Sequence, residues 1–100
     1  MKARNFKDYL KKRLDKNEIA EIESAAKLEY QALRSLQHDI SKAVIDYMSK
    51  NEIGFNEMVE KLDKSPTQVS KIIKGEANIT IATLAHVYAA INKMPRIAAK

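Results

Sequence analysis

The chain has 100 residues, with 18 Lys and Arg, 13 Asp and Glu, and no Cys. A chain of this length forms one domain with at most an appendage, and it buries too little surface to enclose a large substrate cavity. Without Cys it has no disulfide framework, no iron–sulfur cluster and no thiol nucleophile. Two Gly and two Pro favour helices joined by short turns over a β-sandwich or β-barrel.

The net charge of +5 is unevenly distributed along the chain. Residues 1–16 hold seven basic and two acidic side chains, a net +5, and residues 61–100 hold the same numbers. Residues 17–60 hold four basic and nine acidic side chains, a net −5. This asymmetry predicts one surface for an anionic partner and another for a different contact, although solvated helix faces would give the same pattern.

No apolar run has the length of a membrane-spanning helix. The longest uncharged stretch, residues 77–92, is shorter than the ~20 residues that a span requires, and it contains Asn78, Thr80, Thr83 and His86. No apolar signal-peptide core follows the basic N-terminus. We therefore expect a soluble, intracellular protein with no membrane partner.

A short basic segment comes first. Residues 4–14 place Phe6, Leu10 and Leu14 at intervals of four, which predicts a basic helix with one narrow apolar stripe. Such a helix could contact phosphate groups of an anionic partner, or it could simply be solvated. Asn17 is the expected N-cap of the helix that follows.

An apolar stripe then continues along one helical face from residue 19 to residue 48. No Gly or Pro interrupts it, so residues 17–50 form either one helix or two with a bend near residues 35–39. The first part of the stripe has more apolar surface than the chain alone is expected to cover, unless this helix folds back as extra core. We predict an interface there, with a second copy or a different protein. The expected interface residues are Ile19, Ile22, Ala26, Tyr30 and Leu33.

Short helices and short turns follow. The expected helices are residues 39–50, 56–62, 66–74 and 81–92. Gly54 is expected to end the first, and Thr80 to cap the last, whose nearly all-apolar surface predicts a core helix. The fold class is therefore all-α: a compact domain of four to five short helices over residues 37–92, an N-terminal helical extension over residues 1–36 and a tail over residues 93–100.

Residues 65–75 carry the clearest local signal. Ser65 is followed by Pro66 and, three residues on, by Gln68, which predicts a capping box with Pro at the first helical position. Gly75 marks the end of this helix. Its exposed face is expected to present Thr67, Gln68, Ser70, Lys71 and Lys74. Hydroxyl, amide and ammonium groups of this kind can bond base edges and phosphates.

Two short helices joined by three residues, the second with such a face, make a helix-turn-helix pattern. Residues 56–75, NEMVEKLDKSPTQVSKIIKG, resemble the Cro/phage-repressor (Xre) helix-turn-helix family, and residues 78–84 resemble that family's entry into its next helix. The resemblance covers about residues 37–92. It implies a compact, lambda-repressor-like domain.

The chain departs from the family's pattern at three positions. Asp63 stands where the family usually has Gly in the turn. Phe55 stands where the first of the two helices usually begins with Gln or Thr, and Pro66 stands where a residue often reads a base. Direct readout of bases would therefore rest on fewer side chains here.

The resemblance implies a transcriptional repressor that binds double-stranded DNA sequence-specifically, as a homodimer on a pseudo-palindromic operator. It would be cytoplasmic, of bacterial or phage-derived origin, and associated with the nucleoid when bound. Pro66 and Thr67 would face bases, with Ser70 and Lys71 one turn further on. The implied DNA-binding residues are Asn56 (to phosphate), Ser65, Pro66, Thr67, Gln68, Ser70, Lys71 and Lys74 (near the DNA backbone).

Small proteins of this family are often antitoxins that repress their own operon and neutralise a toxin, which gives the alternative function. The toxin would bind the N-terminal helices. A basic toxin would suit the apolar stripe and its acidic neighbours Glu18, Glu21, Glu23 and Glu29.

We do not expect an enzyme. His38 and His86 are far apart in the sequence and have no partner at metal-ligand spacing, and no Gly-rich phosphate loop is present. His86 is expected to satisfy its hydrogen bonds at the edge of the core. The sequence therefore predicts no catalytic residue, no metal and no cofactor.

Overall fold

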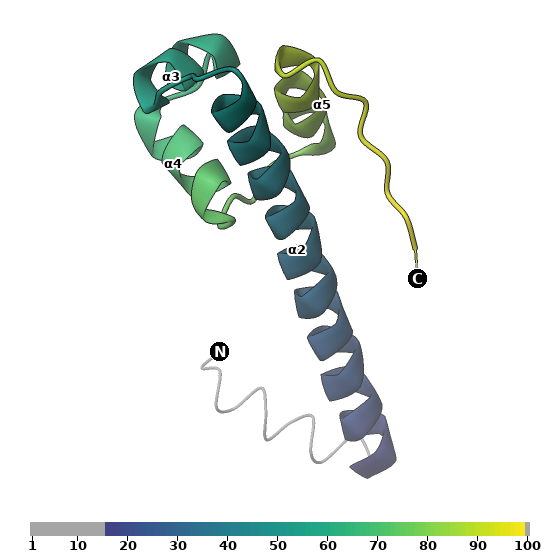
Figure 1. Cartoon of the computed structure of the whole chain (residues 1–100). Helices are drawn as coiled ribbons and strands as arrows, with labels where there is room; N and C mark the ends of the chain where they lie inside the picture. The colour runs from purple at the N-terminus through teal and green to yellow at the C-terminus, as the bar shows by residue number, and fades with distance from the viewer. Residues whose placement is uncertain (1–15, 100) are drawn as a thin grey trace. The chain divides into compact units, whose positions relative to one another are not determined.

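The computed structural model describes residues 16–99, which form four helices and no strand (Figure 1). The helices are α2 (Lys16–Lys50), α3 (Phe55–Leu62), α4 (Pro66–Lys74) and α5 (Ile81–Ala90). The described part of the chain is therefore all-α, as the sequence predicts. Within it, none of the helices has the length and apolar content that crossing a membrane would take. The basic helix expected over residues 4–14 lies outside the described residues.

α2 is one continuous helix of 35 residues. It runs through residues 35–39 without a break, because no Gly or Pro removes a hydrogen bond from its ladder. The prediction of Asn17 as N-cap is wrong, since Lys16 is already helical. The chain divides between Leu33 and Arg34 into two units, and the second half of α2 belongs to the unit that begins at Arg34.

Each helix contributes the apolar side chains of one face to the core of this second unit. α3, α4 and α5 gather around the second half of α2 (Figure 1), and α3 packs against both α4 and α5. The buried apolar side chains are Ile40, Val44, Met58, Leu62, Val69, Ile72, Ala77, Val87 and Ile91. Removing such side chains from water is the main favourable term in the folding of a domain this small.

The prediction of a core helix over residues 81–92 holds for one side of α5 only. Val87 is fully buried, whereas Ile81 is 84% exposed. The helix also ends at Ala90, two residues earlier than expected, and Asn92 has a positive φ of 56°. An uncharged sequence indicates that a helix can be buried, but it does not show how many of its faces other helices will cover.

The turns on either side of α3 place acidic residues in the left-handed backbone region. Gly54 does not end α2 as predicted: the helix ends at Lys50, Glu52 has a φ of 53°, and Gly54 precedes α3 with a φ of −82°. Asp63 follows α3 with a φ of 52°. Asp enters this region more readily than most residues other than Gly, so Asp63 can serve in a turn where a Gly would be the usual choice.

Candidate nucleic-acid interface

Reciprocal hydrogen bonds between Ser65 and Gln68 fix the start of α4. The Gln68 backbone N–H donates to Ser65 Oγ at 3.2 Å, and the Ser65 backbone N–H donates to Gln68 Oε1 at 3.1 Å. Pro66 occupies the first helical turn, where its missing N–H removes no helical hydrogen bond. Gly75 ends the helix with a φ of 73°. The predicted capping box and both helix ends are confirmed.

The two sides of α4 separate as the sequence predicts. Val69 and Ile72 are 0% and 2% exposed, and Ser70 is half-buried at the margin. The exposed residues of the predicted site on α4 and its cap are Ser65, Pro66, Thr67, Gln68, Lys71 and Lys74. α4 therefore presents hydroxyl, amide and ammonium groups to solvent, while its other side is held in the core.

Gln68 belongs both to the cap and to the exposed face. Its Oε1 accepts the Ser65 backbone N–H and lies 3.3 Å from Ser65 Oγ, which donates to it. A side-chain amide also carries two N–H donors. Because the oxygen is engaged in the cap, the amide nitrogen is the part of Gln68 that is best placed to meet an acceptor on a ligand.

α3 begins without a side-chain cap. Its N-cap is Gly54, whereas the hydroxyls of Ser65 and Thr80 cap α4 and α5. The N-cap of α3 therefore gives its first-turn N–H groups no side-chain acceptor, and N–H groups of this kind can bind an anion. Glu57 already places one carboxylate in this turn. Asn56 lies in this first turn and is exposed, which is compatible with the phosphate contact expected of it.

A groove of about 250 Å³ runs beside α4. Gln68 and Lys71 of α4 line it, together with Lys64 from the turn before the helix and Asn78 from the loop after it. Lys64 and Asn78 are not among the site residues predicted from the sequence, because they lie outside the helix with the clear motif. In the folded chain, the ammonium group of Lys64 and the amide group of Asn78 add hydrogen-bond donors to the polar side of α4.

Side chains of α2 hold the other end of α4. Gln37 Nε2 donates to the backbone carbonyl of Ala77 at 2.8 Å, and Ser41 Oγ donates to the carbonyl of Ile73. Gln37 and Ser41 are 7% and 9% exposed. Buried carbonyls need donors, so these two side chains fasten the last turn of α4 and the following loop to α2.

Arg34 completes this attachment. Its Nη1 donates to the carbonyl of Gly75 at 3.0 Å and to Gln37 Oε1 at 3.2 Å. Arg34, Gln37 and Ser41 are spaced three and four residues apart and so share one face of α2. In the sequence, these three residues are recognisable only as polar positions at helical spacing beside an apolar stripe. Their hydrogen-bond partners lie 32 to 41 residues further along the chain, so the sequence alone does not identify them.

Replacing Gln37 by Ala is expected to lower the free energy of unfolding by about 1–3 kcal/mol, because the buried Ala77 carbonyl loses its donor. Urea denaturation measures the change. Gln31→Ala is the matched control, since it removes the same side chain from an exposed position on the same helix, and it should stay within about 0.5 kcal/mol of wild type. Equal losses in the two variants would rule out a stabilising role for the Gln37 hydrogen bond.

His86 is used within the fold, as the sequence predicts. Its Nε2 lies 2.8 Å from the carbonyl oxygen of Leu62 and donates to it, since a carbonyl can only accept.

The other titratable groups of this part of the fold give no sign of a metal or catalytic centre. Burial, and secondarily the negative charge of Asp39, raises the pKa of the Tyr88 hydroxyl. Residues 16–99 contain no cluster of three or more His, Asp and Glu side chains that could share a metal ion.

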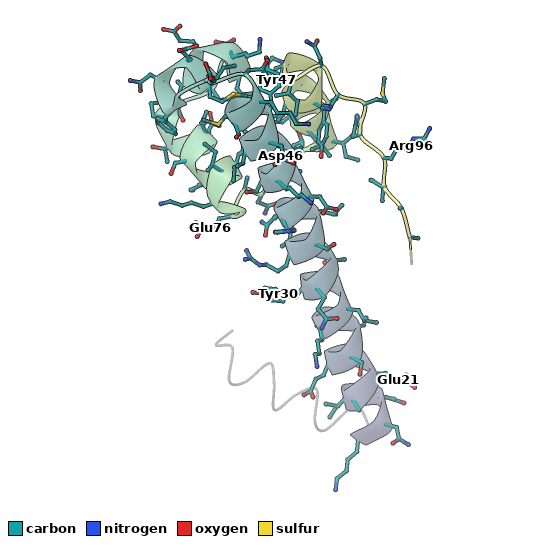
Figure 2. All side chains as sticks on the ribbon, in the orientation of Figure 1. Glu21, Tyr30, Asp46, Tyr47, Glu76 and Arg96 are labelled. Carbon is teal, nitrogen blue, oxygen red and sulfur yellow. The ribbon has the colours of Figure 1, made fainter. Side chains whose placement is uncertain are left out.

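The predicted interface stripe on the first half of α2 faces solvent. Ile22 is 50%, Tyr30 63% and Leu33 38% exposed. Ala26 is also exposed, and Ile19 is half-buried. Tyr30 extends away from the helix (Figure 2). These side chains leave apolar surface open on the unit that precedes Arg34.

No protein-family model, no curated protein and no solved structure matches this chain.

Proposed function

We propose that the chain is a transcriptional repressor that binds double-stranded DNA sequence-specifically as a homodimer. α3, the connecting residues 63–65 and α4 make a helix-turn-helix unit of the phage-repressor type, with α4 as the recognition helix. The observation that carries the proposal is the two-sided character of α4. One side is locked into the core, and the other offers polar and basic groups with no acidic residue among them.

Each part of this unit has a distinct task at the DNA. Thr67 and Lys71 lie one turn apart on the exposed face of α4 and contact base edges in the major groove. Lys74, at the end of the helix, neutralises a backbone phosphate. The uncapped first turn of α3 with Asn56 receives another phosphate at its N–H groups. The attachment of α4 to α2 keeps these contacts in one fixed arrangement.

Selection from a random duplex library tests the proposal. A repressor enriches a two-fold symmetric site and binds it at least about 10³ times more tightly than unrelated duplex at the same salt concentration. Binding that rises and falls with salt but enriches no sequence would reduce the function to non-specific association with phosphates.

The exposed stripe on α2 favours a second function, that of an antitoxin whose first helices bind a toxin. Ile22, Tyr30 and Leu33 offer apolar area, and at ~100° per residue Glu23 and Glu29 lie on the two sides of the stripe. A basic partner protein would complement this surface. The test is complex formation with the product of the adjacent reading frame, measured by gel filtration for wild type and for Tyr30→Asp. Loss of the complex in the variant supports the antitoxin role, and the absence of any complex contradicts it.

A further inference from the structure

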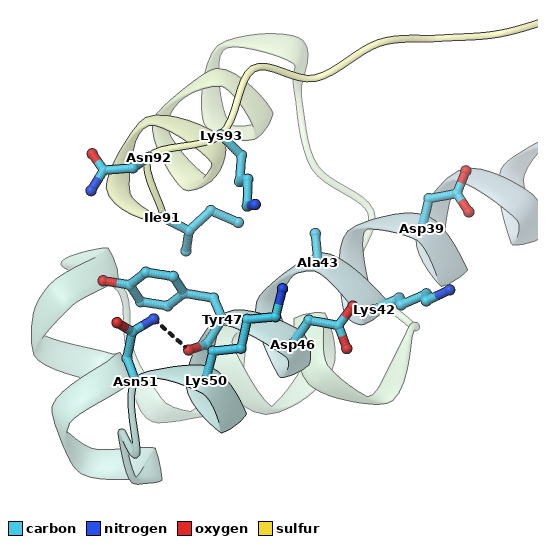
Figure 3. Close-up of a pocket in the computed structure, with 10 residues that line it drawn as sticks. All are labelled: Asp39, Lys42, Ala43, Asp46, Tyr47, Lys50, Asn51, Ile91, Asn92 and Lys93. Atoms are coloured by element: carbon cyan, nitrogen blue, oxygen red, sulfur yellow. Dashed lines mark hydrogen bonds between the residues drawn. The ribbon is translucent and has the colours of Figure 1, made fainter.

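Two open surfaces along α2 take no part in the proposed DNA contacts. One is a groove of about 480 Å³ between the second half of α2 and the turn that follows α5 (Figure 3). Its apolar residue Ile91 is 1% exposed and points toward the Tyr47 ring, so it already packs within the fold (Figure 3). Aspartates and lysines line this groove together, and these mixed charges favour no particular ligand. The other surface, called the α2 stripe below, lies on the first half of the helix and consists of Ile19, Ile22, Ala26, Tyr30 and Leu33.

The α2 stripe has the same order of side-chain sizes in both directions from Ala26. Ile22 and Tyr30 lie four residues before and after it, and Ile19 and Leu33 lie seven residues before and after it. At ~100° per residue, all four lie within about 40° of the direction of Ala26. Two-fold symmetric contacts need a self-complementary patch, because residue i of one copy meets residue j of the other and the reverse. The stripe meets this condition, with a small side chain at its centre and two large apolar ones on either side.

The centre of the α2 stripe is open enough for a close contact between helices. Tyr30 is 63% and Ile22 50% exposed, and Ala26 is exposed between them. The axes of packed helices lie about 8–10 Å apart, depending on the side chains at the contact. Because Ala26 is small, it allows the shorter distance, at which the large side chains of two helices interleave on both sides of it.

We propose that the first half of α2 pairs with the same segment of a second copy of the chain, antiparallel and with the two-fold axis beside Ala26. In naming a second copy, the proposal rests in part on the proposed function, which requires a dimer. Ile19 of one copy then lies level with Leu33 of the other, and Ile22 lies level with Tyr30. The pairing ends at Leu33, the last residue of the first unit, so it uses none of the side chains that fasten α4 to α2.

The part of α2 that is free of core contacts has the length that an antiparallel partner needs. Gln37 is the first residue of α2 that is buried. With Ala26 at the centre, Lys16 at the start of the partner's α2 lies level with Leu36, directly before Gln37. A parallel partner would instead continue along the face of α2 that carries Val44, five full turns after Ala26. Val44 is fully buried in the core, so that face is already covered.

The charges beside the α2 stripe are complementary in this arrangement. Glu23 and Lys27 are exposed and lie one turn apart on the same flank of the stripe. In an antiparallel pair each flank faces the same flank of the other helix, so Glu23 of each copy comes within reach of Lys27 of the other. Residues 19–33 hold two further charges, Glu21 on the far side of the helix and Glu29 on the opposite flank from Glu23. The pairing therefore brings opposite charges together without placing Glu23 beside Glu29.

Sedimentation equilibrium without DNA measures the pairing. Wild type should be a dimer, and Tyr30→Asp should raise its dissociation constant about tenfold or more, since it places a charge in an apolar interface. Leu28→Asp is the matched control, because Leu28 is 67% exposed on the opposite side of the same helix, and it should leave the constant unchanged. A monomeric wild type would overturn the proposal and leave the stripe to a different protein or to residues 1–15. Equal effects of the two substitutions would also overturn it.

A charge exchange tests the contact between Glu23 and Lys27. Glu23→Lys and Lys27→Glu should each weaken the dimer about fivefold, because each places like charges together. An equimolar mixture of the two variants should recover the affinity as a mixed dimer, in which every pair is again of opposite charge. Lys27→Ala removes the attraction without adding repulsion, and it should change the constant little, since exposed ion pairs contribute little. Weakening by both reversals with no recovery in the mixture contradicts the contact.

Cross-linking tests the orientation, because the natural chain has no Cys. A short bis-maleimide should join two Ala26→Cys chains at the two-fold axis. It should also join an Ile19→Cys chain to a Leu33→Cys chain in a mixture, whereas neither of these variants should cross-link with itself. Cross-links within each of the two variants alone would show a parallel pair and overturn the arrangement.

The outcomes for the dimer and for DNA binding are independent. If Tyr30→Asp weakens the dimer but wild type enriches no duplex sequence, the assignment of the α2 stripe stands and the repressor function fails. If an operator is enriched and Tyr30→Asp remains fully dimeric, the function stands and the assignment of the stripe fails.

Discussion

Thr67→Ala and Lys71→Ala are each expected to weaken binding to the selected operator by about 1–3 kcal/mol, without a change in stability. Both side chains are exposed on α4, so their removal opens no cavity and breaks no buried hydrogen bond. Thr67 loses a hydroxyl that can bond a base edge and a methyl group that can contact a thymine methyl, and Lys71 loses a donor to guanine or phosphate. Titration of a labelled operator at fixed salt measures the loss.

Lys27→Ala is the charge-matched control, since Lys27 is exposed on α2 and is not among the residues proposed to contact DNA. It should change operator affinity little. Relaxed preference at one operator position in the Lys71→Ala variant would identify a base contact. A uniform loss over all sequences, with a smaller salt slope, would identify a phosphate contact. If both α4 variants bind like wild type, α4 is not the recognition helix.

The structure of α4 could be predicted from the sequence to the residue, because its signals are local. The Ser65–Gln68 capping box and Gly75 determine both ends through groups that are at most a few residues apart. The same holds for Thr80, which caps α5 as predicted. Signals of this kind act within one turn of helix and do not depend on the rest of the fold.

Gly54 shows where local signals become ambiguous. A glycine between two helices can end the first or precede the second. Here Glu52 takes the left-handed conformation and Gly54 becomes the N-cap of α3. This outcome matters for the site, because a Gly N-cap gives the first-turn N–H groups of α3 no side-chain acceptor, and these are the groups that we propose to receive a phosphate.

The attachment of α4 to α2 could not be predicted, because it depends on tertiary contacts. Gln37 and Ser41 bond carbonyls that become neighbours only after the chain has folded. Lys64 and Asn78 reach the groove beside α4 for the same reason. The sequence thus predicted the chemical groups on α4 itself, and the fold added both the parts that hold the helix in place and the donors around it.

Leu62→Ala is expected to cost about 2–5 kcal/mol of the free energy of unfolding. Leu62 is the last residue of α3, is 0% exposed and belongs to the cluster through which α3 packs on α4 and α5. Truncation leaves a cavity where three helices meet, and the loss is a large share of a total of roughly 5–15 kcal/mol. Calorimetry should show Tm falling by about 4–8 °C for each kcal/mol lost.

Ile81→Ala is the control for this prediction, because it removes a similar aliphatic group from a position that is 84% exposed, and it should change stability by less than about 0.5 kcal/mol. The hydrogen bond from His86 to the Leu62 carbonyl is retained in the Leu62→Ala variant, so the comparison isolates side-chain packing. Equal and small effects of the two substitutions would mean that α3 does not pack on α4 as described. The turn at residues 63–65 would then not hold α4 in a fixed position, and the basis for treating it as a recognition helix would be lost.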